Sequence, residues 1–307
     1  MKNCSEEIAK IVIDSTKEVD LKKNWREIVK YAKVNDVAIP VLRYLKEEGL
    51  CSERHFIQLF NKEAKNYDLF WQSVIEIAQL FSRKNIEYAV IKTRRIYEFY
   101  DWDIDVLVRR EDWSKALKVL QGHGFKRAHM FSHPLASLEA DKLLMEKRGG
   151  FPIHLHRRVS WHGVEYFSSD LVLSSSLEVE GVYYPSKAID ALIYCAHSIF
   201  ENYELTLGEV YHFMKTTDSS VHDFILSLAN ENGWLEGARL SIKAMKNIWS
   251  SLNSRESIKL PYRYELRSLL KAWSEHAQKR GLNLYEVTFI NLFKYLLKRC
   301  SEVRSKI

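Results

Sequence analysis

The sequence predicts an α+β fold, with a small α/β core between two helical regions. Apolar residues recur at intervals of three and four on both sides of the centre, and the centre itself contains short extended segments. Only 11 Gly and 5 Pro occur in 307 residues, which favours long regular elements over linkers. We therefore divide the chain into an N-terminal helical region (1–84), an α/β core (85–185) and a C-terminal helical region (186–307).

The N-terminal region shows helical periodicity from Ser5 to Arg83. Two apolar faces carry the pattern, and they comprise Trp25, Ile28, Val29 and Ala32 in one segment and Phe56, Trp71, Ile75, Ala78 and Leu80 in the next. Pro40 lies between these segments, which predicts either a break between helices or the first turn of a helix.

The core is predicted to contain short strands and one amphipathic helix. The expected helix runs from Glu111 to Leu120 and ends at the glycines Gly122 and Gly124. The expected strands are 86–91, 104–108, 143–146, 153–156 and 182–184, of which the third and fourth flank Arg148-Gly149-Gly150 and should form a hairpin. From Ser186 onward the helical period returns and continues to the C-terminus.

The triplet Asp103-Ile104-Asp105 is the most informative part of the sequence. In a strand, residues i and i+2 point to the same face, with backbones about 6.5–7 Å apart. Two carboxylates so placed can bind one divalent ion or bridge two. The apolar run Val106-Leu107-Val108 follows directly, so the strand enters the interior. Because unpaired carboxylates are costly to bury, we expect a cation beside them.

A basic turn precedes this triplet. Lys92 and Thr93 close the expected strand 86–91, and Arg94 and Arg95 follow. A strand end that offers amides, a hydroxyl and cations is suited to phosphate groups. The alternative is an ordinary solvated basic turn.

This order of strand, Lys-Thr turn, loop, Asp-Ile-Asp-Val-Leu-Val and amphipathic helix resembles the DNA polymerase β-type nucleotidyltransferase superfamily. It is closest to the uncharacterised nucleotidyltransferase group whose core reads KG…DIDLLV…DLH. The flanking patterns Trp25…Val37…Pro40…Leu42…Leu45 and Pro185…His197…Leu207 are similar to the terminal helical parts of that group. The resemblance spans about residues 20–250 and implies a small mixed-sheet nucleotidyltransferase core flanked by N-terminal and C-terminal helical regions.

The resemblance implies a metal-dependent transfer of NMP from an NTP to an acceptor hydroxyl. Asp103 and Asp105 would coordinate Mg²⁺ or Mn²⁺ at the triphosphate. Lys92 and Thr93, with Arg94 and Arg95, would bind the nucleotide. The hydroxyl would attack the α-phosphorus in line, and pyrophosphate would leave. The acceptor is not identified by the resemblance.

Two positions depart from the superfamily pattern. Lys92-Thr93 stands where a Gly-Gly or Gly-Ser pair is usual, which restricts close approach of the backbone to phosphate. His154 stands where the third carboxylate is expected, in His154-Leu155-His156.

Several interpretations of His154 are open. It can act as a general base, or as a ligand that, together with His156, would favour Mn²⁺ or Zn²⁺ over Mg²⁺. It can also mark a catalytically impaired protein that binds nucleotide or RNA. An acid from elsewhere would be a further solution, with Glu146 and Glu165 as the nearest candidates.

Three residues outside these motifs are weaker candidates. Trp102, directly before the triplet, can stack a nucleobase or simply pack at the start of the strand. By analogy with the family, His197 and Glu209 would face the cleft; the alternative is a polar pair between helices.

Charge and composition limit the partners. Residues 259–307 contain eleven Lys or Arg against four Glu, whereas the whole chain has a net charge of +6. This segment could meet RNA or another polyanion, or could be a solvated helix face. No segment approaches the roughly 20 apolar residues needed to cross a bilayer, so we expect no membrane partner. The four cysteines are far apart and the acidic N-terminus has no cleavage site, which predicts a cytoplasmic protein with reduced thiols.

Overall fold

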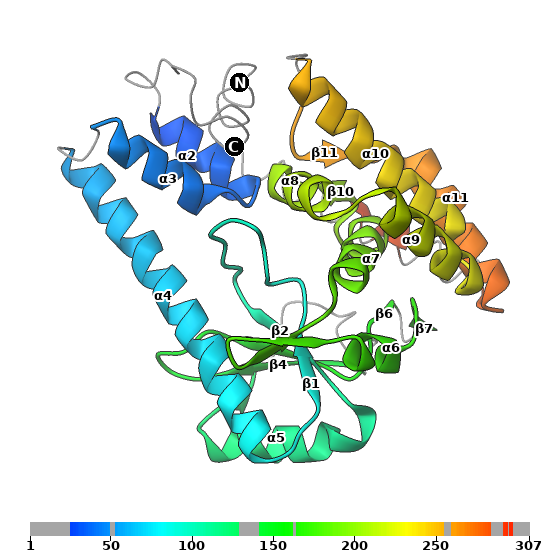
Figure 1. The fold of residues 1–307 in the computed structure, drawn as a ribbon, viewed down its shortest axis with the longest axis horizontal. Helices are drawn as coiled ribbons and strands as arrows, with labels where there is room; N and C mark the ends of the chain where they lie inside the picture. The colour runs from blue at the N-terminus through cyan, green and yellow to red at the C-terminus, as the bar shows by residue number, and fades with distance from the viewer. Residues whose placement is uncertain are drawn as a thin grey trace.

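A five-stranded mixed sheet lies between two groups of helices (Figure 1). The computed structural model describes residues 25–49, 53–128, 141–161, 164–254, 259–283, 291–293 and 295–296. The strand order is β1-β2-β5-β4-β3, with β1 at Tyr88–Val90, β2 at Ile104–Val108, β3 at Lys126–Arg127, β4 at Lys142–Glu146 and β5 at Ile153–His156. Strands β2 and β5 are parallel, and the other neighbours are antiparallel. The predicted α+β fold with a small mixed sheet is confirmed.

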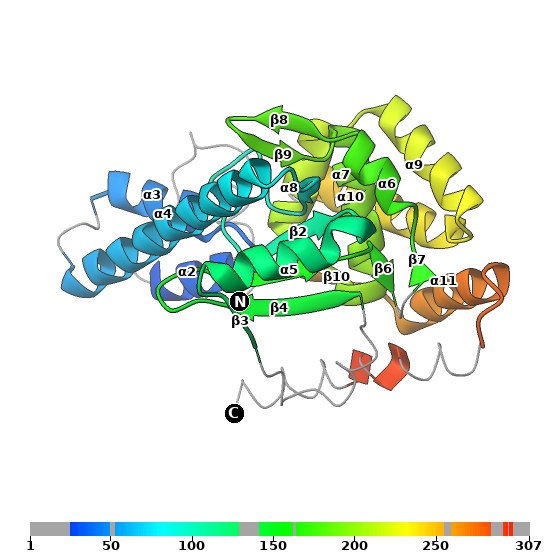
Figure 2. The same cartoon turned by 90° about the horizontal axis from the view of Figure 1, so that it is seen from below.

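One face of the sheet is covered by the helices α4 (Arg54–Arg83) and α5 (Trp113–Gly122), which lie side by side in Figure 2. Along β2, Ile104, Val106 and Val108 share an apolar cluster with these helices. Because side chains alternate along a strand, the residues between them point to the opposite face. There Leu107 joins the apolar cluster of the C-terminal helices. Asp105 therefore points to the side of the sheet that faces those helices.

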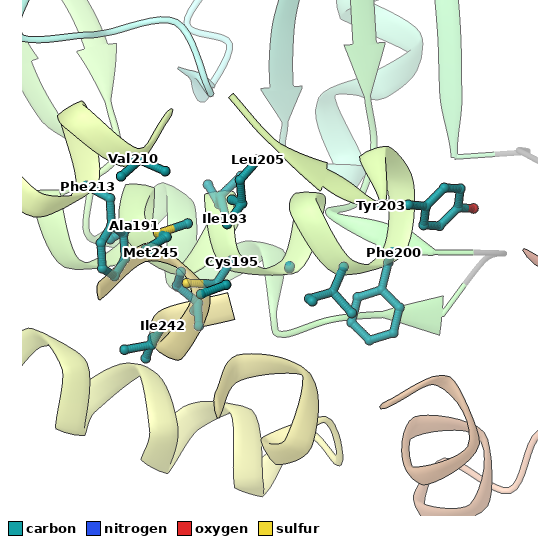
Figure 3. Close-up of a cluster of buried hydrophobic side chains, with 14 of the residues drawn as sticks. Ala191, Ile193, Cys195, Phe200, Tyr203, Leu205, Val210, Phe213, Ile242 and Met245 are labelled. Carbon is teal, nitrogen blue, oxygen red and sulfur yellow. The ribbon is translucent and has the colours of Figure 1, made fainter. Parts of the chain in front are cut away.

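The C-terminal helices form the second layer. They are α7 (Lys187–His197), α8 (Leu207–Thr216), α9 (Ser219–Glu231), α10 (Leu235–Asn253) and α11 (Leu266–Lys279). Figure 3 shows part of their core, in which Ile193 and Cys195 of α7 and Met245 of α10 lie among buried apolar side chains. This core stabilises the fold mainly through buried apolar surface, at roughly 25 cal/mol per Å².

The N-terminal helices α2 (Trp25–Val34) and α3 (Ala38–Glu47) contribute to the same apolar cluster as the C-terminal helices. The later part of α4, from Phe70 on, packs instead with the sheet. One helix of the predicted N-terminal region thus links both layers. The division at residues 84 and 185 stays a prediction.

The predicted elements of the core are largely present. Strand β2 has the expected bounds, the β4–β5 hairpin forms with Leu143 opposite Leu155, and β1 is shorter than residues 86–91. Helix α5 follows a 3-10 turn at Arg110–Asp112 and ends at Gly122, and Gly124 then takes a φ of +85°. Residues 5–24 of the expected N-terminal helices lie outside the described residues.

Several short elements were not expected from the sequence. They are α6 (Ser169–Ser174), a π-helix at Ser198–Asn202, the pair β6 (Ser160–Trp161) with β7 (Val164–Glu165), and the pair β10 (Glu204–Leu205) with β11 (Tyr262–Arg263). The strand expected at 182–184 is present as β9 (Val182–Tyr184), and it pairs with β8 (Leu177–Val179), which was not expected. Among the described residues, no helix is both long and apolar enough to cross a membrane.

Candidate active site

Asp103 and Asp105 lie at the beginning of β2 with their side chains on one face of the sheet. Nδ1 of His154 is 3.3 Å from Oδ2 of Asp103 and 3.7 Å from Oδ1 of Asp105. The carboxylate side chains are only 4% and 8% exposed, whereas that of His154 is 19% exposed. The pair is therefore enclosed by protein, and His154 lies on its more open side.

Parallel pairing of β2 with β5 brings the two histidines to the aspartates. Asp105 and His154 are register partners across the two strands. His156, two residues further along, places Nε2 2.5 Å from Oδ1 of Asp105. Burial lowers the pKa of His156 to about 4, so its imidazole is neutral at pH 7. Since an ionised carboxylate can only accept, Nε2 carries the proton and donates it to Asp105.

Lys92 completes this group from the end of β1. Its Nζ lies 2.8 Å from Oδ2 of Asp105, and its side chain is 14% exposed. Although burial opposes ionisation of both groups, each charge favours the other: Lys92 holds the pKa of Asp105 well below its usual range, and Asp105 raises that of Lys92. We call Lys92, Asp103, Asp105, His154 and His156 the site cluster.

The backbone of Lys92 is left-handed at the turn where the superfamily pattern has glycine. Its φ of +61° lies in the left-handed region, which glycine adopts most easily. The turn therefore keeps the conformation of a glycine turn although a lysine occupies it. This lysine directs its side chain to Asp105.

Asp103 is the least satisfied member of the site cluster. Its Oδ2 is buried and makes no hydrogen bond with any described residue, although Nδ1 of His154 is within ion-pair distance. Burial, and next the charge of Asp105, raise the pKa of Asp103 to about 6. A buried carboxylate oxygen without a partner is expected to bind a cation when one is available.

The cluster contains suitable donor atoms for such a cation. One ligand atom from each of Asp105, His154 and His156 lies within 4.8 Å of the others. His156 Nε2 is occupied by Asp105, so His154 is the imidazole free for a metal. One imidazole with carboxylates is a donor set that suits Mn²⁺ or Zn²⁺, whereas Mg²⁺ prefers oxygen ligands alone. The residues present therefore fit a divalent ion.

The other predicted nucleotide-binding residues make different contacts. The buried Thr93 donates its hydroxyl to the Ile91 carbonyl at 3.0 Å. Arg94 is exposed, with its guanidinium 5.8 Å from the ring centre of Tyr184. Within the described part of the chain, neither residue forms a hydrogen bond or ion pair with the two aspartates. Their nucleotide-binding roles stay predictions.

Arg95 lies in a second polar group, further along the same loop. Its guanidinium is 4.1 Å from the ring centre of Tyr194 and 4.9 Å from that of Phe99. The carboxylates of Asp36 and Glu209 and the hydroxyl of Tyr97 interact electrostatically with it. We call Arg95, Asp36, Tyr97 and Glu209 the anchor cluster. It connects the loop to the α2–α3 turn and to α8, toward which the loop rises in Figure 1.

Glu201 is a further acidic residue near the site that the sequence did not single out. It lies on the π-helix, where Oε2 accepts from Lys142 at 3.0 Å and lies 3.5 Å from Nε2 of His197. Oε1 accepts from the Tyr166 hydroxyl at 3.1 Å. The charge of Glu201 helps to raise the pKa of Lys92. The i, i+4 pairing of His197 with Glu201 was the available sequence signal.

The acids considered from the sequence lie elsewhere. Glu146 is exposed at the end of β4 opposite Lys126, and Glu165 accepts from Ser169 at 2.8 Å. Glu209 caps α8, accepting from the Thr206 backbone at 2.9 Å. Neither hydrogen bonds nor ion pairs join any of the three to Asp103 or Asp105 in the described ranges.

The basic C-terminal segment is partly neutralised where the structure describes it. Arg263 lies 3.8 Å from Glu204, Lys279 lies 3.7 Å from Glu275, and Lys271 pairs with Glu236. Binding of a polyanion by residues 259–307 stays a prediction.

Comparison with known proteins identifies the family. The family described as "Uncharacterised nucleotidyltransferase" matches residues 22–249. The chain belongs to this nucleotidyltransferase family. The match includes both the site cluster and the anchor cluster, and it agrees with the nucleotidyltransferase resemblance of the sequence. The finer motif pattern KG…DIDLLV…DLH stays a prediction.

Among solved structures, the chain is similar to the antibiotic-resistance factor ANT(2'')-Ia, known from a solution structure. The sequences are 11% identical and the TM-score is 0.33, with 62% of this chain and 97% of that chain covered. No curated protein sequence matches the chain.

Proposed function

We propose that this member of the family transfers NMP from an NTP to an acceptor hydroxyl, with a divalent cation held by Asp103, Asp105 and His154. The observation that supports it best is the buried Oδ2 of Asp103, which makes no hydrogen bond with a described residue and lies 3.3 Å from Nδ1 of His154. A cation bound there would give the buried carboxylate the partner that its burial requires.

A bound Mn²⁺ or Mg²⁺ would neutralise charge on the triphosphate. The acceptor oxygen would bond to the α-phosphorus while the bond to the bridging oxygen of the β-phosphate breaks. Pyrophosphate would leave, and the hydroxyl proton would pass to solvent. The protein would contribute mainly orientation and charge, as is usual for phosphoryl chemistry.

Of the four residues predicted to bind nucleotide, we propose that Lys92 and Arg94 contact phosphate. Lys92 already lies in the site cluster, and Arg94, two residues later, is exposed. Thr93 and Arg95 would instead shape the turn, because the Thr93 hydroxyl binds a backbone carbonyl and Arg95 lies between two rings.

The test combines nucleotide binding with turnover. Purified protein with Mn²⁺ or Mg²⁺ should bind an NTP and transfer label from its α-phosphate to an acceptor supplied from a panel of hydroxyl compounds. The double variant Asp103→Asn, Asp105→Asn should lose both. Asp223→Asn, which removes an exposed carboxylate of α9, is the matched control and should behave as the wild type. Undiminished transfer by the double variant would refute the site.

A catalytically impaired protein that binds nucleotide or RNA is the second candidate. It is favoured by His154 in the place of the third carboxylate and by the Lys92 ion pair with Asp105. NTP binding without turnover, and turnover gained by His154→Asp, would support it. RNA binding through the basic segment should weaken steeply with salt, because phosphate contacts release counterions.

A further inference from the structure

Asp105 has an internal partner on each of its carboxylate oxygens. Oδ2 is 2.8 Å from Nζ of Lys92, and Oδ1 is 2.5 Å from Nε2 of His156. Asp103, two residues away, has a buried oxygen without any described hydrogen-bond partner. The two aspartates are thus in opposite states: one is fully paired within the protein and the other is not.

A divalent ion that uses both aspartates must therefore displace a partner of Asp105. His156 belongs to strand β5 and its side chain is only 3% exposed, so it is held by the sheet. Lys92 lies in a turn after β1, carries a long flexible side chain and is 14% exposed. Two cations on the same carboxylate also repel each other, which disfavours Lys92 beside a divalent ion. Lys92 is the partner that can leave.

We propose that Lys92 is a resident cation of the site, which competes with the divalent ion for Asp105 and moves to the triphosphate when metal and nucleotide bind together. This inference rests on the proposed function. It makes the metal and the nucleotide thermodynamically coupled: the metal releases Lys92 for phosphate, and the phosphate draws Lys92 away from Asp105. The metal alone should bind weakly, and the nucleotide should strengthen it.

The backbone at Lys92 is consistent with this role. A φ of +61° is unfavourable for a lysine and is maintained only where the surroundings determine it. Here it aims the ammonium at the aspartates from the same turn that precedes Thr93 and Arg94. A small movement of the side chain alone would carry the charge from Asp105 to a ligand beside the turn.

The experiment measures Mn²⁺ affinity without nucleotide, by electron paramagnetic resonance of free Mn²⁺ or by calorimetry. Lys92→Met removes the charge and should bind Mn²⁺ about tenfold more tightly than the wild type. Lys92→Arg keeps a cation and should stay near the wild-type affinity. Lys147→Met is the matched control, because Lys147 also forms an ion pair, at 2.6 Å with Glu76, but away from the site.

A second titration in the presence of a non-hydrolysable NTP completes the test. The wild type should bind Mn²⁺ more tightly with the nucleotide than without it, and Lys92→Met should lose most of this difference. If Lys92→Met binds Mn²⁺ with unchanged or lower affinity while circular dichroism shows it folded, the inference is wrong. If Lys92→Met does not fold, Lys92→Gln takes its place in the same titration.

The same titrations separate the two proposals. Loss of Mn²⁺ binding in Asp103→Asn, Asp105→Asn without any tightening in Lys92→Met would overturn only the role of Lys92. Wild-type Mn²⁺ binding in the double aspartate variant would overturn the metal site, and with it the proposed function.

Discussion

The loop from Lys92 to Trp102 provides one basic residue to each of two very different polar groups. Lys92 enters the site cluster, which adjoins the partly exposed His154 and leaves an oxygen of Asp103 unpaired. Arg95, three residues later, enters the anchor cluster between aromatic rings and faces Asp36 and Glu209. The first group adjoins an exposed edge where a ligand can reach it. The second encloses Arg95, whose buried Nε and Nη1 make no hydrogen bond with a described residue, and it connects three parts of the chain.

This difference separates residues that would contact a ligand from residues that hold the loop in place. Charges that a ligand must approach are kept near an opening and partly unsatisfied. Charges that hold a loop in place are enclosed with their opposites. Mutations in the anchor cluster should therefore mainly lower the free energy of unfolding, whereas mutations in the site cluster should mainly change the affinity for metal and nucleotide.

The largest effect on stability is expected from Arg95→Met. It removes the guanidinium from beside the rings of Tyr194 and Phe99 and takes away the charge that acts on Asp36 and Glu209, which together should cost about 3 kcal/mol. Lys92→Met should cost clearly less, because His156 still binds Asp105. Urea unfolding monitored by circular dichroism gives both values, with the exposed Arg94→Met as control. Equal losses for Arg95→Met and Lys92→Met would remove the distinction between the clusters.

The next effect is a pH dependence that originates in the anchor cluster. Burial, and next the charge of Glu209, raise the pKa of Asp36 from 3.8 to about 7. The folded protein therefore holds a proton that the unfolded chain releases, and the free energy of unfolding falls as pH rises from about 4 to about 7. The charged and hydrogen-bonding groups that face Asp36 are Glu209, Arg95, Asp101 and Thr206.

Asp36→Asn remains neutral at every pH and keeps an acceptor for the Thr206 hydroxyl, which donates to Asp36 at 2.9 Å. Asparagine also tolerates the φ of +60° at this position. Relative to the wild type, this variant should gain about 2–3 kcal/mol of stability between pH 5 and pH 8. Histidines such as His156 titrate in both proteins and cancel in the difference. A difference that is constant with pH would show that Asp36 is ionised throughout.

A smaller effect is expected from His154→Ala, and it should appear in metal binding rather than in stability. Because this side chain is mostly covered, at 19% exposed, circular dichroism of the same samples checks that the variant is folded. Loss of one nitrogen ligand should reduce Mn²⁺ affinity about 10- to 100-fold. His154→Asp supplies a carboxylate in place of the imidazole and should recover most of the affinity. Unchanged Mn²⁺ binding in His154→Ala would remove His154 from the metal site.

The sequence predicted the parts of the site that lie on regular strands. An alternation of acid and apolar residues specified strand β2 and put both aspartates on one face, and the hairpin 143–156 brought the histidines to the sheet. These patterns are local, and they are read directly from the spacing of side chains.

The sequence could not indicate which way each basic residue of the loop would point. Lys92 and Arg95 occur in a single run, and only tertiary contacts with α8 and the α2–α3 turn separate them. The left-handed backbone at Lys92 contradicts the usual preference for glycine, so no residue pattern signals it. Glu201 was missed because a π-helix has no periodic signature of its own.

The smallest effect is expected from Trp102→Ala, at the opening of the site cluster. The alternative in which Trp102 packs at the start of β2 does not fit its 64% exposure. Its ring centre lies 6.4 Å from that of His154, so the indole can stack on a planar group that approaches the site cluster. Loss of one stacking contact is worth about 1–2 kcal/mol, which predicts a KM for NTP higher by roughly five- to thirtyfold.

Stability of Trp102→Ala should change by less than about 0.5 kcal/mol, since the side chain covers little core. Trp102→Phe should retain most of the affinity, because it keeps an aromatic face. An unchanged KM for NTP in Trp102→Ala, together with a raised KM for the acceptor, would assign the indole to the acceptor instead of the nucleobase.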